Sequence, residues 1–364
     1  MRTLQSRAVL FSLLILALLI GACQPIAPSA TAPAADAPAA ATTAPGPELS
    51  ATDAPATLVV YSGRNENLVG PLIEQFRAAS GIQVDVRYGD TAELAATILE
   101  EGQNSPADVY FGQDAGALGA LDKAGRFVPL PQTILDQVDG RFRAADGAWV
   151  GASGRARVFV YNTNDLAEAD LPNSIWELTD PQWKGKVGWA PTNGSFQAFV
   201  TALRVLEGED KAREWLAGMI ANETQIFSNN TGIVEAVGRG EVQLGLVNHY
   251  YLYRFLAEQG ESFPARNHHP TAADAGSIIN VAGVGILDTV KNQAAAEQFV
   301  SFLLSAQAQE YFASETTEYP LVEGIAINPL LTPLAEISTP AIDLNDLADL
   351  QGTLELLQES GALQ

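Results

Sequence analysis

Cysteine, histidine and the common catalytic motifs are nearly absent from this sequence. Cys23 is the only cysteine in 364 residues, so the chain offers no pair for an intrachain disulfide and no second thiol for catalysis. The three histidines, His249, His268 and His269, do not have the spacing of a metal site. No HExxH, GxSxG or paired-carboxylate motif is present. These absences argue against a metalloenzyme or a phosphate-ester hydrolase, and we expect a protein that is not an enzyme.

Basic residues are also scarce. The chain has 20 Lys and Arg against 43 Asp and Glu, which gives a net charge of −23. Nucleic acid and anionic membrane surfaces normally bind to a cationic patch, so neither is an expected partner. With 47% hydrophobic residues, the chain has a globular composition and is long enough for two domains.

The N-terminal residues have the pattern of a secreted lipoprotein. Arg2 and Arg7 supply the positive end, and the apolar run that follows is too short to span a membrane comfortably. Residues 1–22 are therefore interpreted as a signal peptide. The four residues Ile-Gly-Ala-Cys that end at Cys23 resemble a bacterial lipobox. That resemblance implies that Cys23 is diacylated and becomes the first mature residue.

A low-complexity stretch follows the cysteine. From residue 24 to about 56 it consists almost entirely of Pro, Ala, Thr, Ser and Asp. Such a stretch has too little apolar surface to offset the entropy lost on ordering, so residues 23–56 are predicted to be a lipidated cysteine and a disordered, semi-extended tether. We expect an extracytoplasmic protein that contacts the cell membrane through its lipid anchor only.

The first half of the folded chain alternates between strand and helix periodicity. Strands are predicted at 58–61, 82–88 and 107–111, with helical patterns after each of them. Repeated strand–helix units predict an α/β fold with a mainly parallel sheet that binds ligands at the carboxyl edge of its strands. Two polar segments lie at that edge: Arg64-Asn65-Glu66 and Gln113-Asp114.

Two Asn-containing loops precede helices in the second half of the chain. Asn193-Gly194-Ser195 follows a strand predicted at 186–190 and opens a helix that continues to Leu206. The loop at 228–232, which contains Asn230, repeats this arrangement. Free amides at a helix start can bind an anion, but the same residue types are also ordinary helix caps. The sequence leaves both interpretations open.

Tyr250 and Tyr251 stand where a strand-like run, 242–247, passes into a helical pattern. Adjacent side chains point to opposite faces of a strand and about 100° apart in a helix, so both hydroxyls can converge only at an irregular junction of this kind. The positive end of a helix favours tyrosinate, and a hard cation could complete the deprotonation by direct coordination. The alternative interpretation is aromatic packing.

The C-terminal third returns to apolar strand and helix patterns. A strand is predicted at 278–287 and is taken as the return to the first domain. A long helix is predicted at 292–313, and a terminal helix at 344–357 is interrupted by Gly352. These segments are expected to contribute to the core.

Several segments together resemble the ferric-ion-binding proteins, which are the extracytoplasmic receptors of iron ABC transporters and have the type II periplasmic-binding-protein fold. The resemblance extends from about Thr57 to the C-terminus. The segments that carry it are Tyr61-Ser62-Gly63-Arg64-Asn65-Glu66, Ser105-Pro106-Ala107-Asp108-Val109-Tyr110-Phe111, Ser153-Gly154-Arg155-Ala156-Arg157-Val158, Trp183-Lys184-Gly185-Lys186-Val187-Gly188 and Asn248-His249-Tyr250-Tyr251-Leu252-Tyr253.

The resemblance implies a two-lobed α/β fold with mainly parallel sheets and a hinge between the lobes. The N-lobe would comprise residues 57–155 and 280–331, and the C-lobe residues 156–279 and 332–364. The chain would cross between the lobes near Arg155 and near Ile279-Asn280.

The resemblance also implies a metal site in which Tyr250 and Tyr251 are ligands. In the best-known branch of the family a histidine and a glutamate complete the protein ligands, and this sequence has Asn65 and Gln113 at those places. Other branches add a tyrosine from the second-lobe loop, where this sequence has Phe196. Two tyrosinates leave one positive charge on Fe(3+), and coordination positions stay open for a synergistic anion such as carbonate or phosphate.

A further set of polar residues is expected to bind that anion or the ligand. For Arg155 and also for Arg157, an interlobe salt bridge is an equal alternative. Glu66 and Asp114 could approach the metal in place of the two amides, although both could also be solvated surface carboxylates. The expected anion- or ligand-binding residues are Arg64, Asn65, Gln113, Arg155, Asn193, Gly194, Ser195, Asn230 and Asn248.

The expected function is therefore that of an extracytoplasmic solute-binding lipoprotein. It would act as a monomer that binds ferric iron and an anion between its lobes and delivers them to an ABC transporter permease. The alternative keeps the fold and changes the cargo to an organic solute such as a phosphonate, thiamine or a polyamine.

Overall fold

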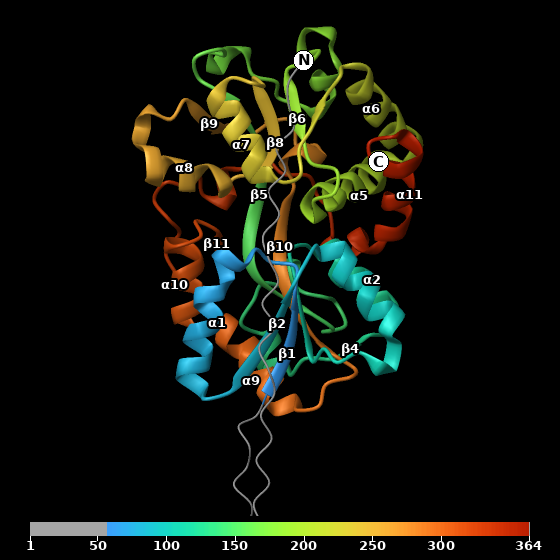
Figure 1. Cartoon of the computed structure of the whole chain (residues 1–364), viewed down its shortest axis with the longest axis vertical. Helices are drawn as coiled ribbons and strands as arrows, with labels where there is room; N and C mark the ends of the chain where they lie inside the picture. The colour runs from blue at the N-terminus through green and yellow to red at the C-terminus, as the bar shows by residue number, and fades with distance from the viewer. Residues whose placement is uncertain (1–56, 364) are drawn as a thin grey trace, which may run out of the picture. The chain divides into compact units, whose positions relative to one another are not determined.

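The computed structural model describes residues 57–363. The predicted signal peptide, Cys23 and the tether lie outside the described residues. Within the described part, no helix has the length and hydropathy needed to cross a membrane. Figure 1 shows two lobes connected by two long strands, β5 (Val150–Asn162) and β10 (Ile279–Leu287).

The first lobe follows the strand–helix alternation that the sequence predicts. Helix α1 begins after Asn65, whose side chain accepts a hydrogen bond from the Asn67 amide, and ends at Gly81, where φ is +71° and a side chain would be strained. The elements of this lobe are β1 (Thr57–Ser62), α1 (Glu66–Ser80), β2 (Gln83–Tyr88), α2 (Thr91–Glu101), β3 (Val109–Gly112), α3 (Ala115–Lys123), β4 (Phe127–Val128), α4 (Gln132–Leu135), α9 (Gln293–Leu303), α10 (Ala306–Ser314) and β11 (Tyr319–Pro320).

The second lobe is built mainly from the middle of the chain. Its core holds Trp189 and Trp215, whose rings are 6.1 Å apart and almost completely buried. The elements are β6 (Val187–Trp189), α5 (Gly194–Glu207), α6 (Glu209–Ala221), β7 (Gln225–Ile226), α7 (Asn230–Arg239), β8 (Leu244–Asn248), α8 (Tyr251–Gln259), β9 (Ala265–His268) and, from the C-terminal segment, α11 (Leu350–Ser360).

The sheets are mixed, so the expectation of mainly parallel sheets was wrong. Strand β1 pairs in parallel with β2 and β3, and β6 pairs in parallel with β7 and β8. The two crossing strands, however, run antiparallel to every described neighbour, including each other. A chain that passes from one lobe to the other and back must reverse direction, and this reversal places antiparallel strands in the middle of the order β2-β1-β3-β10-β5-β8-β6-β7.

Two predicted helices are each divided by an aspartate or serine cap. The helix predicted at 292–313 is two helices, because Ser305 has extended backbone angles and its hydroxyl caps α10 by accepting from the Ala308 amide at 3.3 Å. The terminal helix breaks at Asp349, which caps α11, while Gly352 lies inside that helix. In both cases a capping side chain starts a new helix, although the apolar residues continue with helical spacing across the break.

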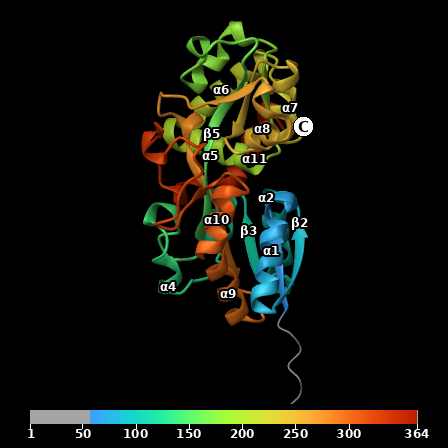
Figure 2. The same cartoon turned by 90° about the vertical axis from the view of Figure 1, so that its left-hand side faces the viewer.

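Helices α1, α9 and α10 lie side by side on the first lobe, as Figure 2 shows. The Phe76 ring on α1 meets Phe299 on α9 edge to face at 5.1 Å, and the Tyr311 hydroxyl on α10 donates to the Leu68 carbonyl at 2.9 Å. This packing holds the return segment against the first strands, and it fixes the position of the segment 315–320 that follows α10.

Candidate metal and anion site

The tyrosine pair lies at a strand-to-helix junction, as its sequence context predicts. Strand β8 ends at Asn248, Tyr250 precedes helix α8, and Tyr251 is the first residue of that helix. The two rings have their centroids 4.4 Å apart and an angle of 31° between their planes. Only 2% of Tyr250 and 8% of Tyr251 is exposed. The junction therefore brings both phenols together in the interior.

His249 anchors this junction. Its Nδ1 accepts a hydrogen bond from the Ala156 amide at 3.1 Å, so Nε2 carries the proton and donates to the Thr317 carbonyl at 2.8 Å. Burial lowers the pKa of His249 to about 4, which keeps the ring neutral at physiological pH. With both nitrogens occupied, His249 positions the tyrosine pair and is not free to coordinate a metal.

Burial also decides the protonation of Tyr250. Desolvation raises the pKa of Tyr250 well above its usual value, the neighbouring Tyr251 adds to the increase, and Arg64 and Arg155 oppose it. The effect of burial therefore outweighs the helix N-terminus, which was expected to favour tyrosinate. In the metal-free protein Tyr250 is a neutral phenol at neutral pH, and a coordinating cation must displace its proton.

Arg64 is held in the site by an acid that the sequence did not reveal. Its Nη2 donates to Glu318 Oε2 at 2.6 Å, and Glu318 also accepts from Ser153 and Thr316 at 3.0 and 2.9 Å. Arg64 is 2% exposed and Glu318 is fully buried. Glu318 follows Arg64 by 254 residues and belongs to no periodic pattern, so no sequence signal pairs them. Arg64 keeps Nε and Nη1 without a partner.

Arg155 and Arg157 lie on strand β5, and most of their guanidinium nitrogens have no hydrogen-bond partner in the described part of the chain. The three side-chain nitrogens of Arg155 and both terminal nitrogens of Arg157 lack hydrogen bonds among residues 57–363. Neither arginine forms an ion pair within this range, so the interlobe salt bridge weighed as an alternative is not found. Burial, with a smaller contribution from Arg155, lowers the pKa of Arg157 to about 9. Both guanidiniums remain cationic at neutral pH.

The loop before α5 forms a polar network that reaches across both lobes. Ser195 Oγ donates to Asn193 Oδ1 at 2.5 Å and accepts from Asn248 Nδ2 at 3.0 Å and from Gln113 Nε2 at 3.3 Å. Asn230 Nδ2 donates to Asn193 Oδ1 at 3.3 Å. Asn193 also caps α5 by accepting from the Ser195 amide, and Asn229 caps α7 by accepting from the Gly232 amide. The two loops therefore cap their helices and also bring four of the expected anion-binding side chains around Ser195.

Other sequence candidates lie at the edge of the site or outside it. Asn65 and Glu66 are exposed at the start of α1, where Asn65 acts as a helix cap. Asp114 caps α3 through one carboxylate oxygen and leaves Oδ2 buried without a partner. Phe196 is 1% exposed and meets Trp189 edge to face at 5.5 Å, so its ring belongs to the core of the second lobe.

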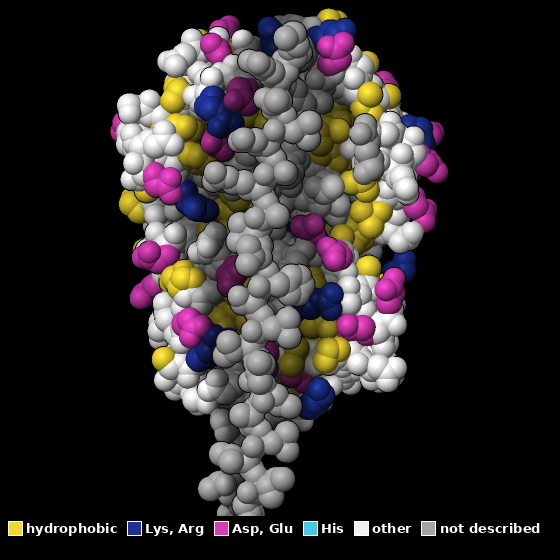
Figure 3. All heavy atoms as spheres, in the orientation of Figure 1, with side chains coloured by type: hydrophobic (Ala, Val, Ile, Leu, Met, Phe, Trp, Pro, Cys, Tyr) yellow, Lys and Arg dark blue, Asp and Glu magenta, His cyan; other side chains and the backbone are white. Residues whose placement is uncertain are grey.

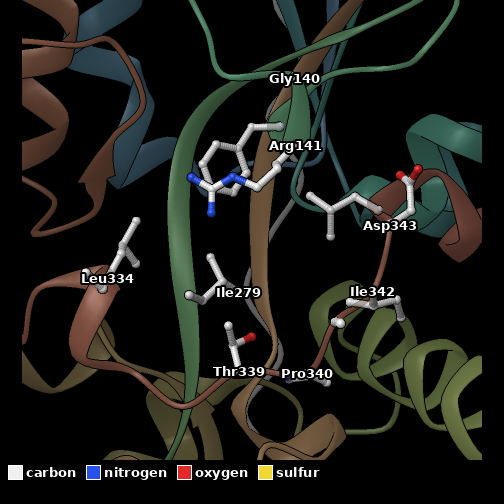
Figure 4. A pocket seen from close by; sticks show the side chains of 12 residues that line it. Gly140, Arg141, Ile279, Leu334, Thr339, Pro340, Ile342 and Asp343 are labelled. Atoms are coloured by element: carbon white, nitrogen blue, oxygen red, sulfur yellow. The ribbon is translucent and has the colours of Figure 1, made fainter.

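Within the described residues no cluster of three or more His, Cys, Asp or Glu could hold a metal. A cavity of about 890 Å³ lies beside the crossing strands and is shown in Figure 4, but its walls are mainly apolar. Ile279, Leu334 and Ile342 line it, and neither tyrosine of the pair does. This cavity is therefore distinct from the site around Tyr250 and Tyr251.

Gly194 is another point at which the start of α5 meets the first lobe. A Cβ at this position would lie 2.7 Å from Asp114 Oδ2 and 3.1 Å from the Thr91 Cβ. We predict that Gly194→Ala prevents full closure of the lobes, because the added methyl group would clash with the first lobe. Ligand retention should weaken at least about tenfold, since a shift of about 1 Å in the binding residues has a large effect on affinity. Small-angle scattering and ligand dissociation rates measure both effects.

The control for this variant is Gly140→Ala, because a Cβ at Gly140 would meet no atom within 4 Å. It should leave scattering and dissociation unchanged. A Gly194→Ala protein that compacts on ligand addition as the parent does would contradict the closing contact.

The sequence is similar to those of known solute-binding proteins. The profile of the bacterial extracellular solute-binding protein family matches residues 71–332. The Fe(3+)-binding periplasmic protein of Serratia marcescens is 35% identical over 315 residues, covering 86% of this chain and 93% of that protein.

Solved structures agree with this result. Iron-bound HitA from Pseudomonas aeruginosa superposes with a TM-score of 0.81 and 36% identity, covering 84% of this chain and all of that one. A Trichodesmium protein in complex with iron and citrate superposes with a TM-score of 0.71 and 28% identity, covering 84% of this chain and 99% of that one. The family profile, the identity across most of both chains and the two-lobed α/β fold lead to one conclusion: the chain belongs to the bacterial extracellular solute-binding proteins and is a relative of the ferric-ion-binding members of that family.

Proposed function

We propose that this protein is an extracytoplasmic receptor that binds ferric iron together with a synergistic anion between its two lobes. It then delivers the iron to the permease of an ABC transporter. The observation that carries the proposal is the buried pair of phenols, Tyr250 and Tyr251, with centroids 4.4 Å apart beside the buried cation Arg64. The relatives named as iron-binding proteins support ferric iron over an organic solute as the cargo.

The chemistry of the tyrosine pair suits a hard trivalent cation. Ferric iron prefers anionic oxygen ligands, and two phenolates supply them once iron has displaced their protons. Fe(3+) with two tyrosinates keeps one positive charge. Gln113, which stands where the resemblance places the glutamate ligand, is a neutral amide that donates to Ser195. The remaining charge therefore calls for an anion that is not part of the chain.

The start of α5 and the free arginine nitrogens provide places for such an anion, for which we propose carbonate or phosphate. Backbone amides at a helix N-terminus and the amides of Asn230 and Asn248 are neutral donors, while Arg64 and Arg155 add charge-assisted ones. Asn193 and Gly194 shape this helix start. An anion bound there would complete the metal coordination and offset the buried guanidiniums.

Removal of the anion tests this function. The iron-free protein receives one equivalent of ferric chloride in carbonate- and phosphate-free buffer, and again with each anion restored. We predict about one iron per chain after gel filtration when either anion is present and at least about tenfold weaker retention when both are absent. Equal retention in all buffers would mean that protein groups fill the open positions, and no retained iron in any buffer would contradict the function.

The N-terminal segment completes the proposed arrangement. We propose that residues 1–22 are removed and that Cys23 carries lipid, so that the tether lets a monomeric receptor reach the permease from the membrane surface. Mass spectrometry of the membrane-extracted protein should show Cys23 as a lipidated first residue. An unmodified cysteine or an intact signal segment would contradict this part of the proposal.

A further inference from the structure

The turn that follows α10 contains a strained residue. Thr317 has a φ of +55°, in the left-handed region that a β-branched residue rarely adopts, and it is 7% exposed. Such a backbone conformation is unfavourable, and it persists only where the surrounding contacts hold it. The contacts of Thr316, Thr317 and Glu318, which we call the 316–318 turn, hold it here.

Buried charge fixes one end of the 316–318 turn to the first lobe. Glu318 accepts from Arg64 at 2.6 Å, from Ser153 at 3.0 Å and from Thr316 at 2.9 Å. Figure 3 shows charged side chains spread over the visible face of the described part, whereas Arg64 is 2% exposed and Glu318 is fully buried. Salt screens a buried ion pair much less than an exposed one, so this attachment persists at physiological ionic strength.

The carbonyl of Thr317 reaches the tyrosine junction of the second lobe. It accepts a hydrogen bond from His249 Nε2 at 2.8 Å. His249 is also bound to β5, because its backbone amide donates to the Ala156 carbonyl and its Nδ1 accepts from the Ala156 amide, both at 3.1 Å. Since His249 directly precedes Tyr250, the bond to Thr317 ties the turn to the proposed metal ligands.

These contacts close a ring around the predicted crossing point of β5. Tyr319, which follows the turn, pairs with Gly154, and His249 is bound to β5 two residues further along. Arg155 lies between these two attachments, where the chain is predicted to pass from one lobe to the other. A bend of β5 at Arg155 therefore changes the distance between Thr317 and His249.

The hydrogen bond and the strain act in opposite directions. The lobes are in contact in this structure, since Gln113 of the first lobe donates to Ser195 of the second at 3.3 Å. In this closed state the bond from His249 holds Thr317 in the left-handed conformation. When the lobes part and the bond lengthens, the turn is free to relax. The bond therefore favours the closed state, and the strain favours opening.

We propose that Thr317 is a positioning residue of this receptor. Its carbonyl holds the tyrosine junction through His249 while the lobes are closed, and the release of its backbone strain as the lobes part sets the rate at which iron leaves. This inference rests on the proposed function, because the ferric ion bound by Tyr250 and Tyr251 is the cargo whose release it controls.

Thr317→Gly tests the strain, because glycine adopts the left-handed region without steric cost. The full chain is loaded with one equivalent of ferric chloride and hydrogencarbonate, a hydroxamate chelator is added in excess, and the decay of the visible band is followed. We expect the variant to lose iron at least about threefold more slowly than the parent. Thr317→Asn should slow iron loss to a smaller degree, since asparagine tolerates this region better than threonine, and it serves if the glycine variant does not fold.

Two control variants separate this effect from a general gain in stability. Glu223→Gly relieves the same kind of strain at a second left-handed residue, with a φ of +53°, whose side chain is 68% exposed. It should raise stability against urea and leave iron loss unchanged. Thr317→Val keeps a β-branched side chain in the turn, so it should lose iron no more slowly than the parent.

Two variants of His249 test the hydrogen bond. The amide of asparagine reaches only the place of Nδ1, so His249→Asn keeps the bond to Ala156 and loses the bond to Thr317. Iron loss should become at least about fivefold faster. His249→Gln places its amide near Nε2 and should restore the slower loss. In the His249→Asn background Thr317→Gly should no longer slow iron loss, because a turn without this bond has already relaxed.

Equal rates of iron loss for Thr317→Gly and the parent would overturn the proposal, because the turn would then stay left-handed when the lobes part. A Thr317→Gly effect that persists unchanged in the His249→Asn background would overturn it as well. The failure of the proposed function has a different signature. A parent protein that develops no visible band with iron and hydrogencarbonate would reject iron binding itself, and this inference with it.

Discussion

Replacing Tyr250 or Tyr251 by phenylalanine is expected to abolish the visible band of the ferric protein. Iron–tyrosinate charge transfer requires the phenolate oxygen, which phenylalanine lacks. Each variant should also retain iron at least about 100-fold more weakly, since each removes an anionic ligand from a site with few others. The visible spectrum and the rate of iron loss to a chelator measure these effects.

The fold should survive both substitutions. The rings are buried and pack against each other at 4.4 Å, and phenylalanine preserves that packing. Tyr253→Phe is the matched control on the same helix, because its hydroxyl donates to the Leu330 carbonyl at 3.1 Å and lies outside the pair. It should lose about 1 kcal/mol of stability and keep the band. If both pair variants bind iron as tightly as the parent, the tyrosines are structural and an organic cargo becomes the better account.

The second large expected effect is a gain in iron retention. Gln113→Glu should raise iron retention at least about tenfold and make it less dependent on added anion, because a carboxylate is a hard, anionic oxygen ligand where the parent has a neutral amide. The side chain has nearly the same shape, it is 8% exposed, and it already reaches Ser195 from the opposite lobe. Iron retention in anion-free buffer, compared with the parent, measures the change.

Asn65→Asp is the control for this gain. It makes the same amide-to-acid change at an exposed position where the side chain caps α1, and aspartate caps helices as well as asparagine does. It should leave retention unchanged. A Gln113→Glu protein that still needs the anion as strongly as the parent would show that residue 113 lies too far from the metal to coordinate it.

The sequence predicted the features that depend on local patterns. The strand–helix order of the first lobe, the loop before α5 and the junction at Tyr250 follow from periodicity and capping residues, and the structure confirms them. The resemblance to the ferric-ion-binding proteins predicted the two-lobed fold and is confirmed by the comparisons. These features are encoded within windows of a few residues to a few tens of residues.

The features that were missed depend on distant contacts. Glu318 meets Arg64 across 254 residues, and no spacing in the segment 315–320 marks this glutamate as the partner of Arg64. The mixed sheet arises because β5 and β10 pass between the lobes in opposite directions. A hydrophobic pattern shows where a strand lies, but it does not show the direction in which the strand pairs with its neighbours. Ser305 divides a helix because its hydroxyl caps α10, although the apolar residues continue with helical spacing.

The visible spectrum of the purified protein with one equivalent of ferric iron and carbonate tests the central claim most directly. Two tyrosinates bound to Fe(3+) should give a broad visible band that grows linearly to about one iron per chain and disappears when a strong chelator removes the metal. A colourless protein that retains no iron under these conditions would contradict the account, and a protein that retains iron without the band would place the metal away from Tyr250 and Tyr251.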